Sequence, residues 1–458
     1  MKKILAAGFS LFIFFLQTHS YAGGPFAVDV INDSGVALRW KNDTMNWYLD
    51  PGRVSNSVEN STGKDWVNEA LDTWRDITIP NAEGEPVKTS TFKSHYEGNL
   101  PADVTSQNSH PYLSASSGVS SIIFDEDGDI TAKLLGASNR ATVVGLSAPL
   151  LSDYSGLYIT KGFALFNGYV LDDGKLAPES DVAKKLFKAT ILHEIGHMIN
   201  LDHSQVNDSI AQECGREGTL YTRGGECGEK GKYIPTMYPE LLTFTQGALS
   251  MDDRVTVSWI YPSTEFQSDF CLITGEIFDA DGKPLKGVNV IASRADVEED
   301  IARTDSRSFV SGVLHSGCKG GAKYYLYGIL PGVPYQVSYE PINSAYTGTS
   351  GFEPNIVKPS GFEAGIITSS SGASTVKCSK GGNTIEMASA TIDTPNPCAS
   401  ENDDSNGDGS NPASAESSTS CSFSTAGGAV GTAAFLFISI ITAMLASDFV
   451  RRRREKNA

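Results

Sequence analysis

The apolar residues in the first part of the chain follow two different periods. Residues 38–40 and 47–52 alternate between apolar and polar side chains, which is typical of a strand that ends in a turn. Residues 122–124 and 163–168 are short apolar runs that indicate buried strands. The 3.6-residue spacing of a helix packed on a sheet is found at Trp66, Ala70, Leu71 and Trp74. The pattern predicts a domain of mixed strands and helices that ends near residue 262.

A second pattern of alternating residues begins after residue 262. Residues 273–290 alternate, turn at Asp281 and Gly282, and alternate again, which predicts a β-hairpin. Residues 325–327 and 335–339 supply a later pair of strands. The spacing of these turns and strands resembles the carboxypeptidase-regulatory-like β-sandwich modules. The resemblance implies an all-β accessory domain over residues 263–393.

Both ends of the chain carry long apolar runs. Lys2 and Lys3 precede a run of apolar residues that ends in a small-x-Ala site at Ala22, so residues 1–22 are predicted to be a secretory signal peptide. Residues 426–447 are apolar and long enough to cross a bilayer. Arginines at 451–454 follow, and the positive-inside rule places the tail 448–458 in the cytoplasm. We therefore expect an exported chain, anchored in the cell membrane with the residues before 426 on the non-cytoplasmic side.

The segment before this transmembrane helix is polar. Residues 394–425 are rich in Ser, Asn and Asp, which predicts a disordered linker. The small residues around Gly427 and Gly428, the apolar helix and the arginine cluster together resemble bacterial sorting tails. Such tails are cut by a membrane peptidase, which releases the protein or attaches it to the surface. A permanent anchor and C-terminal processing both remain open.

Charge and cysteine content narrow the partners and the compartment. The formal net charge is −18, and no basic cluster lies on the exported part, which argues against nucleic acid. Seven cysteines in an exported chain predict disulfides. Cys214 and Cys227 bracket a glycine-rich insertion and are predicted to pair. Cys271 is predicted to pair within the second domain, with its partner left open among Cys318, Cys378 and Cys398.

The chemistry of the chain is concentrated between His193 and His203, which read H-E-x-x-H-x-x-N-x-x-H. His193 and His197 are four residues apart, so on a helix they share one face and can share one metal ion. Three neutral imidazoles, with His203 as the third, leave the fourth tetrahedral position open, as in catalytic zinc sites. Glu194 lies beside them and can act as general base toward the attacking water.

The third histidine requires a reversal of the chain. A straight helix would carry His203 past the metal, so the helix must end near Asn200. Glycine is the usual residue at such a left-handed turn, and asparagine is the next most tolerant. We therefore predict a left-handed conformation at Asn200.

The histidine motif is followed by Met237, Tyr238 and Pro239. Together they resemble the metzincin metalloproteases, and within them the matrixins. The resemblance covers residues 37–262 and implies an α+β catalytic domain over residues 23–262, a twisted mixed sheet with long helices. It assigns Met237 to the floor under the zinc. It assigns Tyr238 and Pro239 to one wall of the pocket for the residue after the scissile bond.

The same resemblance assigns roles to two further segments. It implies that residues 163–168 form the edge strand that aligns the substrate by strand addition. It also implies that Asp252 or Asp253 anchors a buried N-terminal amine or a backbone segment.

A separate acidic turn follows the strand at 122–124. Asp125, Asp127 and Asp129 surround Gly128 and could bind a structural Ca²⁺ through oxygen ligands. The alternative is a solvated acidic hairpin turn.

These features predict an exported, membrane-anchored, zinc-dependent endopeptidase that acts on protein or peptide substrates. Two alternatives remain open. The chain could be a catalytically silent metzincin-fold adhesion or scaffold protein, or a hydrolase dedicated to one particular partner. The intact Glu194 favours an active enzyme, because a silent protein has no need of the base.

Overall fold

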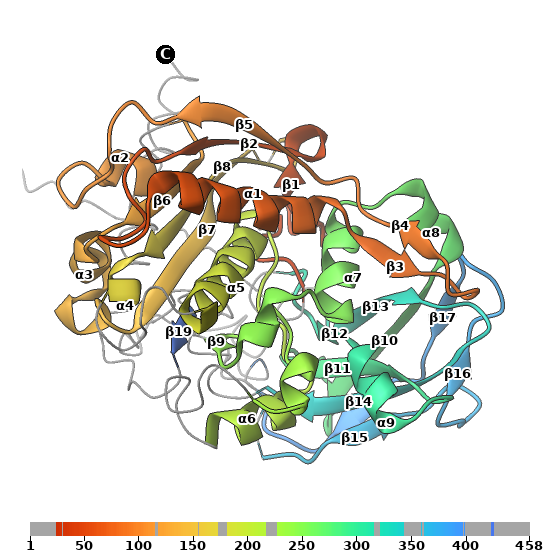
Figure 1. Ribbon diagram of the computed structural model, residues 1–458. Helices are drawn as coiled ribbons and strands as arrows, with labels where there is room; N and C mark the ends of the chain where they lie inside the picture. The colour runs from red at the N-terminus through yellow and green to blue at the C-terminus, as the bar shows by residue number, and fades with distance from the viewer. Residues whose placement is uncertain are drawn as a thin grey trace, which may run out of the picture.

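The computed structural model describes residues 24–29, 31–114, 118–153, 155–172, 181–216, 227–315, 321–342, 359, 361–396, 398 and 423–425 (Figure 1). Over this range the chain is mixed α/β with several sheets. An eight-stranded sheet with two long helices occupies one side of the molecule, and two smaller packed sheets occupy the other (Figure 1).

The large sheet is built mainly from the first 167 residues. Its strands lie in the order β5 (Lys93–Asn99), β2 (Thr44–Leu49), β6 (Ser121–Asp125), β8 (Tyr158–Asn167), β7 (Val143–Asp153), β19 (Phe423–Thr425) and β9 (Glu240–Leu241), with β1 (Arg39–Trp40) also paired to β8. The pairs among β5, β2, β6 and β8 are parallel. β7 runs antiparallel to β8.

Two helices pack together on this sheet, α1 (Asn60–Arg75) and α5 (Asp181–Met198) (Figure 1). The predicted first helix is confirmed, because its buried face includes Trp66, Ala70, Leu71 and Trp74. The indole N–H of Trp74 donates a hydrogen bond to the carbonyl of Leu192 at 2.8 Å, and the rings of Trp66 and Phe187 lie 5.9 Å apart. α1 therefore holds α5 in position on the sheet.

Shorter elements complete this part of the chain. They are η1 (Lys41–Asp43), β3 (Thr78–Pro80), β4 (Pro86–Lys88), α2 (His110–Leu113), α3 (Asp129–Leu135), η2 (Ala137–Asn139), α4 (Tyr169–Asp172), α6 (Asp208–Arg216), η3 (Lys230–Tyr233), η4 (Phe244–Gly247), α7 (Met251–Ile260) and α8 (Thr264–Asp269).

The expected edge strand is not at the edge of the sheet. Residues 163–168 fall almost wholly in β8, which lies between β6 and β7. Every residue of β8 from Lys161 to Asn167 is buried, and a continuous buried run is typical of a central strand covered on both faces. The strand outside it is β7, which contains Pro149 and shows no clear alternation. β7 packs against α5 and lies next to the site described below.

The second part of the chain forms two packed sheets. One contains β13 (Lys323–Ile329), β10 (Cys271–Asp279), β17 (Thr384–Glu386) and β18 (Ala390–Ile392). The other contains β12 (Arg307–Val310), β11 (Val288–Arg294), β14 (Pro334–Pro341), β15 (Gly365–Ile367) and β16 (Val376–Lys377). A common core between them includes Ile273, Ile277, Val290, Tyr324 and Val337.

The predicted hairpin over residues 273–290 forms only next to its turn. The turn itself forms, with Gly282 at φ 76° and the Asp279 N–H bonded to the Lys283 carbonyl at 2.9 Å. However, β10 and β11 then lie in different sheets. The antiparallel pairing ends with the Phe278–Pro284 bridge and the bond from the Leu285 N–H to the Ile277 carbonyl at 2.9 Å, and Gly287 at φ 82° then lets the chain bend away.

The predicted fold class also needs correction. The described chain is mixed α/β with several sheets, and the second part is not purely β because it contains α9 (Glu299–Thr304). Among the described residues no helix has the length and apolar character to cross a bilayer. The longest, α5, carries Asp181, three lysines and Glu194. The predicted span 426–447, the signal peptide 1–22 and the tail 448–458 lie outside the described residues, and β19 falls at the end of the predicted linker.

Two disulfides have both of their cysteines among the described residues. Cys214 bonds to Cys227, as predicted. Cys271 bonds to Cys378, which settles the partner that the sequence left open within the second domain. Cys398 is disulfide-bonded as well.

The two parts of the chain meet along α7. The rings of Trp259 and Tyr327 stack with centroids 5.1 Å apart. Asp252 forms a polar link at the same junction, because its carboxylate accepts hydrogen bonds from the Ser204 hydroxyl at 2.5 Å and the Ser308 N–H at 2.5 Å. Burial raises the pKa of Asp252 to about 6. Ser204 directly follows the third histidine, so this carboxylate ties the second part of the chain to the site.

We predict that Asp252→Asn flattens the pH dependence of stability. A carboxyl whose pKa is raised on folding stabilises the fold when protonated, and loses that contribution as pH rises from about 4 to about 6. Asparagine keeps an acceptor for Ser308 and a donor for Ser204 but does not titrate. Over this window the free energy of unfolding of the wild type should fall by on the order of 3 kcal/mol relative to the variant. Thermal unfolding at several pH values measures this, with the exposed Asp65→Asn as control; parallel curves would contradict the assignment.

Candidate metal centre

The three histidines and the glutamate come from the end of α5 and the loop that follows it. α5 carries His193, Glu194 and His197, and all four site side chains are at most 1% exposed. Gly196 lies between the two helical histidines, where a Cβ atom would overlap the sulfur of Met237. The glycine therefore costs some helix propensity but lets Met237 pack directly against the helix beneath the histidines.

α5 ends at Met198, and Asn200, two residues later, adopts the predicted left-handed conformation at φ 81°. The Leu201 N–H then bonds to the Gly196 carbonyl at 2.9 Å, which closes the helix end. Asn200 has a second role that glycine could not fill. Its side-chain oxygen accepts from the Ala27 N–H at 2.7 Å, and its amide donates to the carbonyls of Ala27 and Leu38 at 3.0 and 2.6 Å. The sequence showed the turn but not these three bonds.

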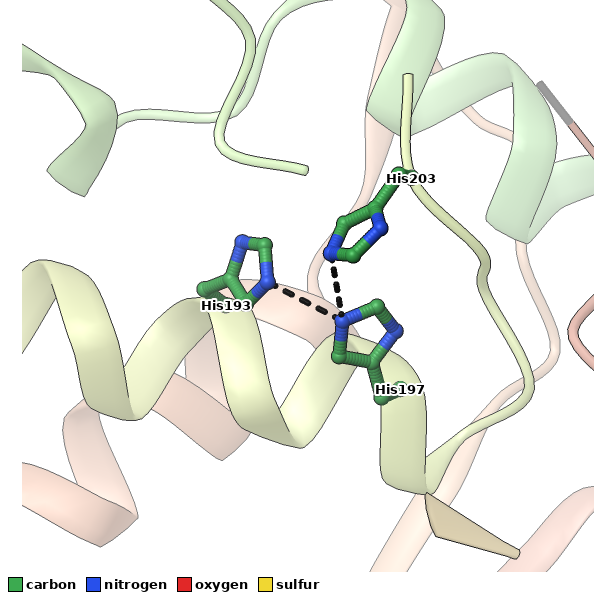
Figure 2. Close-up of side chains that lie close together, drawn as sticks. All are labelled: His193, His197 and His203. Atoms are coloured by element: carbon green, nitrogen blue, oxygen red, sulfur yellow. Dashed lines mark hydrogen bonds between the residues drawn. The ribbon is translucent and has the colours of Figure 1, made fainter. Parts of the chain in front are cut away.

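The reversal brings the three imidazole rings together (Figure 2). The Nε2 atom of His197 lies 3.0 Å from Nε2 of His193 and 3.2 Å from Nε2 of His203. Three nitrogens bound tetrahedrally at about 2.0–2.1 Å from zinc would lie about 3.3 Å apart. Within the described residues this is the one cluster of three or more His, Cys, Asp or Glu side chains placed to hold a metal ion. The structure thus brings together all three predicted ligands.

The other ring nitrogens orient the histidines. Nδ1 of His193 lies 2.7 Å from the Thr236 carbonyl, and Nδ1 of His197 lies 2.8 Å from the Leu201 carbonyl. A carbonyl can only accept, so each Nδ1 donates and the Nε2 lone pair points at its neighbours. Burial, followed by the neighbouring imidazoles, keeps the pKa values of His193 and His203 well below the usual value. Burial also lowers the pKa of His197 to about 4. The neutral rings are the form that binds a metal.

Glu194 packs against strand β7. A Cβ atom at Gly145 would lie 2.7 Å from Cγ of Glu194, so only glycine allows the strand to pass this close. The Ser147 hydroxyl donates to the Glu194 carbonyl at 2.5 Å. Gly145 was not among the predicted site residues. Its only signal in the sequence is a glycine inside an apolar run, which can mark a close backbone approach.

The turn at Met237 is held by Asp253. Its carboxylate accepts hydrogen bonds from the N–H groups of Thr236 at 3.0 Å, Met237 at 3.2 Å and Ser250 at 2.8 Å. This fixes the Thr236 carbonyl on His193 and buries Met237 against Gly196. The predicted anchoring of a backbone segment is therefore confirmed for Asp253.

Tyr238 and Pro239 lead from this turn into β9. Tyr238 is buried, and its hydroxyl donates to Asp208 at 2.9 Å. The ring belongs to an apolar cluster with Ile210, Tyr233, Leu242 and the Cys214–Cys227 disulfide. The disulfide thus braces the turn next to the histidines, while the pocket-wall role of Tyr238 and Pro239 stays a prediction.

The acidic turn predicted to bind calcium makes bonds within the chain. Asp125 is buried, and its carboxylate accepts from the N–H groups of Ile130 at 3.0 Å and Thr131 at 2.8 Å. Asp127 accepts from the Asp129 N–H at 3.0 Å, and Asp129 pairs with Arg140 at 3.2 Å. These bonds stabilise the start of α3. Calcium binding at this turn stays a prediction.

Comparison with known proteins adds no relative. Neither the scan against protein-family models nor the search of curated proteins finds a match for this chain. The interpretation of the site therefore rests on its geometry and chemistry.

Substitutions at Asn200 should distinguish the contribution of its left-handed backbone from that of its side-chain hydrogen bonds. Asn200→Gly should keep the bound metal but lower the free energy of unfolding by about 1–3 kcal/mol, since backbone groups of Ala27 and Leu38 lose their partner. Asn200→Val should also lose metal, because a β-branched residue disfavours a left-handed φ. Metal content and thermal unfolding should be measured together. Asn42→Val, at an exposed left-handed asparagine with φ 56°, is the control and should keep its metal. Full metal occupancy in Asn200→Val would show that the turn argument is wrong.

Proposed function

We propose that the protein is a zinc-dependent endopeptidase. The observation that carries the proposal is the convergence of three neutral, buried imidazole nitrogens at 3.0 and 3.2 Å, with Glu194 beside them. Three imidazole ligands with an open fourth position favour zinc and its hydrolytic chemistry over a closed structural site.

The chain supplies each remaining part of the reaction. When bound, zinc polarises the scissile carbonyl and allows water to attack at neutral pH. Glu194 follows His193 directly in α5 and is placed to accept the proton of the attacking water. The water oxygen bonds to the carbonyl carbon, the C–N bond breaks, and Glu194 returns the proton to the leaving amine. β7 offers backbone groups that can align an extended substrate.

The bonded cysteines support the proposed compartment. The chain contains the disulfides Cys214–Cys227 and Cys271–Cys378. Disulfides form in oxidising compartments and are rare in the reducing cytosol. We therefore include export in the proposal. The acidic net charge of −18 fits a soluble exported domain without identifying a substrate.

Replacement of the base is the direct test. Glu194→Ala should retain one zinc per chain but lose about 10²–10⁴-fold in kcat/KM on a mixed peptide library, because the ligands stay and the proton acceptor is gone. Zinc content and cleavage should be measured on the same samples, and a chelator should abolish cleavage until zinc is restored. Glu83→Ala, in an exposed turn, is the matched control. Cleavage at the wild-type rate in Glu194→Ala would refute the mechanism, and no cleavage by the zinc-loaded wild type would refute the function.

A further inference from the structure

The C-terminal segment β19 lies next to the metal centre. It runs between β7 and β9 in the large sheet (Figure 1). Phe423 and Ser424 pair antiparallel with Gly145 and Val143 of β7. On its other side β19 pairs in parallel with both residues of β9. In the part of the chain that the structure describes, β9 joins the sheet through β19 alone.

The space between β7 and β9 is one strand wide. Neighbouring strands lie about 4.8 Å apart, so two strands that share one neighbour are separated by about 9.6 Å. Both walls present backbone N–H and carbonyl groups, which bind an extended peptide largely independently of its side chains. We call this space the β7–β9 groove. Its geometry fits a single extended peptide that runs antiparallel to β7.

The groove passes over the catalytic residues. Gly145, which pairs with Phe423, is the residue whose missing side chain makes room for Glu194. β9 begins directly after Pro239, at the end of the turn that supports the histidines. α5 also lies beside β19. A peptide in the groove is therefore held with its backbone next to the base.

The site is closed in this arrangement. His193, Glu194, His197 and His203 are each at most 1% exposed, yet a peptidase must admit both a peptide and water to these groups. The strand that a substrate would add to β7 is already present, and the chain itself provides it.

On the basis of the proposed function, we propose that the β7–β9 groove is the peptide-binding site and that residues 423–425 are its resident occupant. The C-terminal segment competes with peptide substrates for the same backbone groups. Displacement or removal of this segment opens the groove. The intact chain is then less active than the same chain with the segment displaced.

The expected size of this effect follows from tethering. A segment tethered to the same chain acts at an effective concentration in the millimolar range. If the short strand binds with a Kd of about 0.1 mM, the ratio of occupied to free groove is about ten. The apparent KM for a competing peptide then rises about tenfold.

The first experiment displaces β19 in the full chain. Ser424→Pro removes the N–H of the central residue, and its ring is poorly tolerated in a strand that pairs on both sides. It should raise kcat/KM on a short fluorogenic peptide about tenfold, mainly through KM, with unchanged zinc content. Ser418→Pro, in the same tail but outside β19 and outside the described residues, is the control and should behave as wild type. Equal KM values in Ser424→Pro and wild type would overturn the proposal.

The second experiment needs no catalysis. In a Glu194→Ala background, hydrogen exchange of the backbone amides at 143–147 should be faster with Ser424→Pro than without it, and unchanged with Ser418→Pro. Equal exchange in all three proteins would show that the segment does not occupy the groove. If the wild-type chain has no peptidase activity but the exchange difference is seen, the proposed function is refuted. The occupation of the β7–β9 groove by residues 423–425 would still be supported.

Discussion

The rest of the structure depends on one constraint. Three imidazole nitrogens must lie close enough together to bind a single metal ion, and they must do so in a fully buried site. Neutral rings whose lone pairs face one another at 3.0 and 3.2 Å gain nothing from each other without a cation. Burying them without solvent is also costly. The surrounding chain therefore has to hold each ring by its other nitrogen, as the carbonyls of Thr236 and Leu201 do for His193 and His197. Other features near the site support those two carbonyls and the reversal to His203.

Neighbouring aspartates on α7 divide this support between them. Asp253 binds the backbone of the turn at Thr236 and Met237, and so controls the carbonyl that orients His193. Asp252 points to the other side and links Ser204, next to His203, with Ser308 in the second part of the chain. The second part is thus mechanically connected to the metal centre.

The large sheet approaches the candidate site along β7, at the side of this strand that pairs with β19. A bare sheet edge invites pairing with any extended chain, which is a hazard for most proteins and a binding mode for a peptidase. Here β7, whose outer side pairs with β19, lies directly against Glu194 because Gly145 has no side chain. The same backbone groups that would align a substrate are paired with residues 423–425. Selectivity in such a groove comes first from whether it is free, and only then from side-chain pockets.

Features that depend on residues close together in the chain could be predicted from the sequence. The i, i+4 spacing of His193 and His197, the left-handed turn at Asn200 and the buried face of α1 all follow from local geometry. The Cys214–Cys227 bond was predictable because the two residues enclose a short insertion. Tertiary structure decided the rest. The order of strands places β7 rather than β8 beside the base, β10 and β11 separate into two sheets, and a strand from residue 423 onward pairs with residue 145. Strand pairing between distant segments depends on which edges meet after folding, and hydrophobic periodicity reports only which face of each strand is buried.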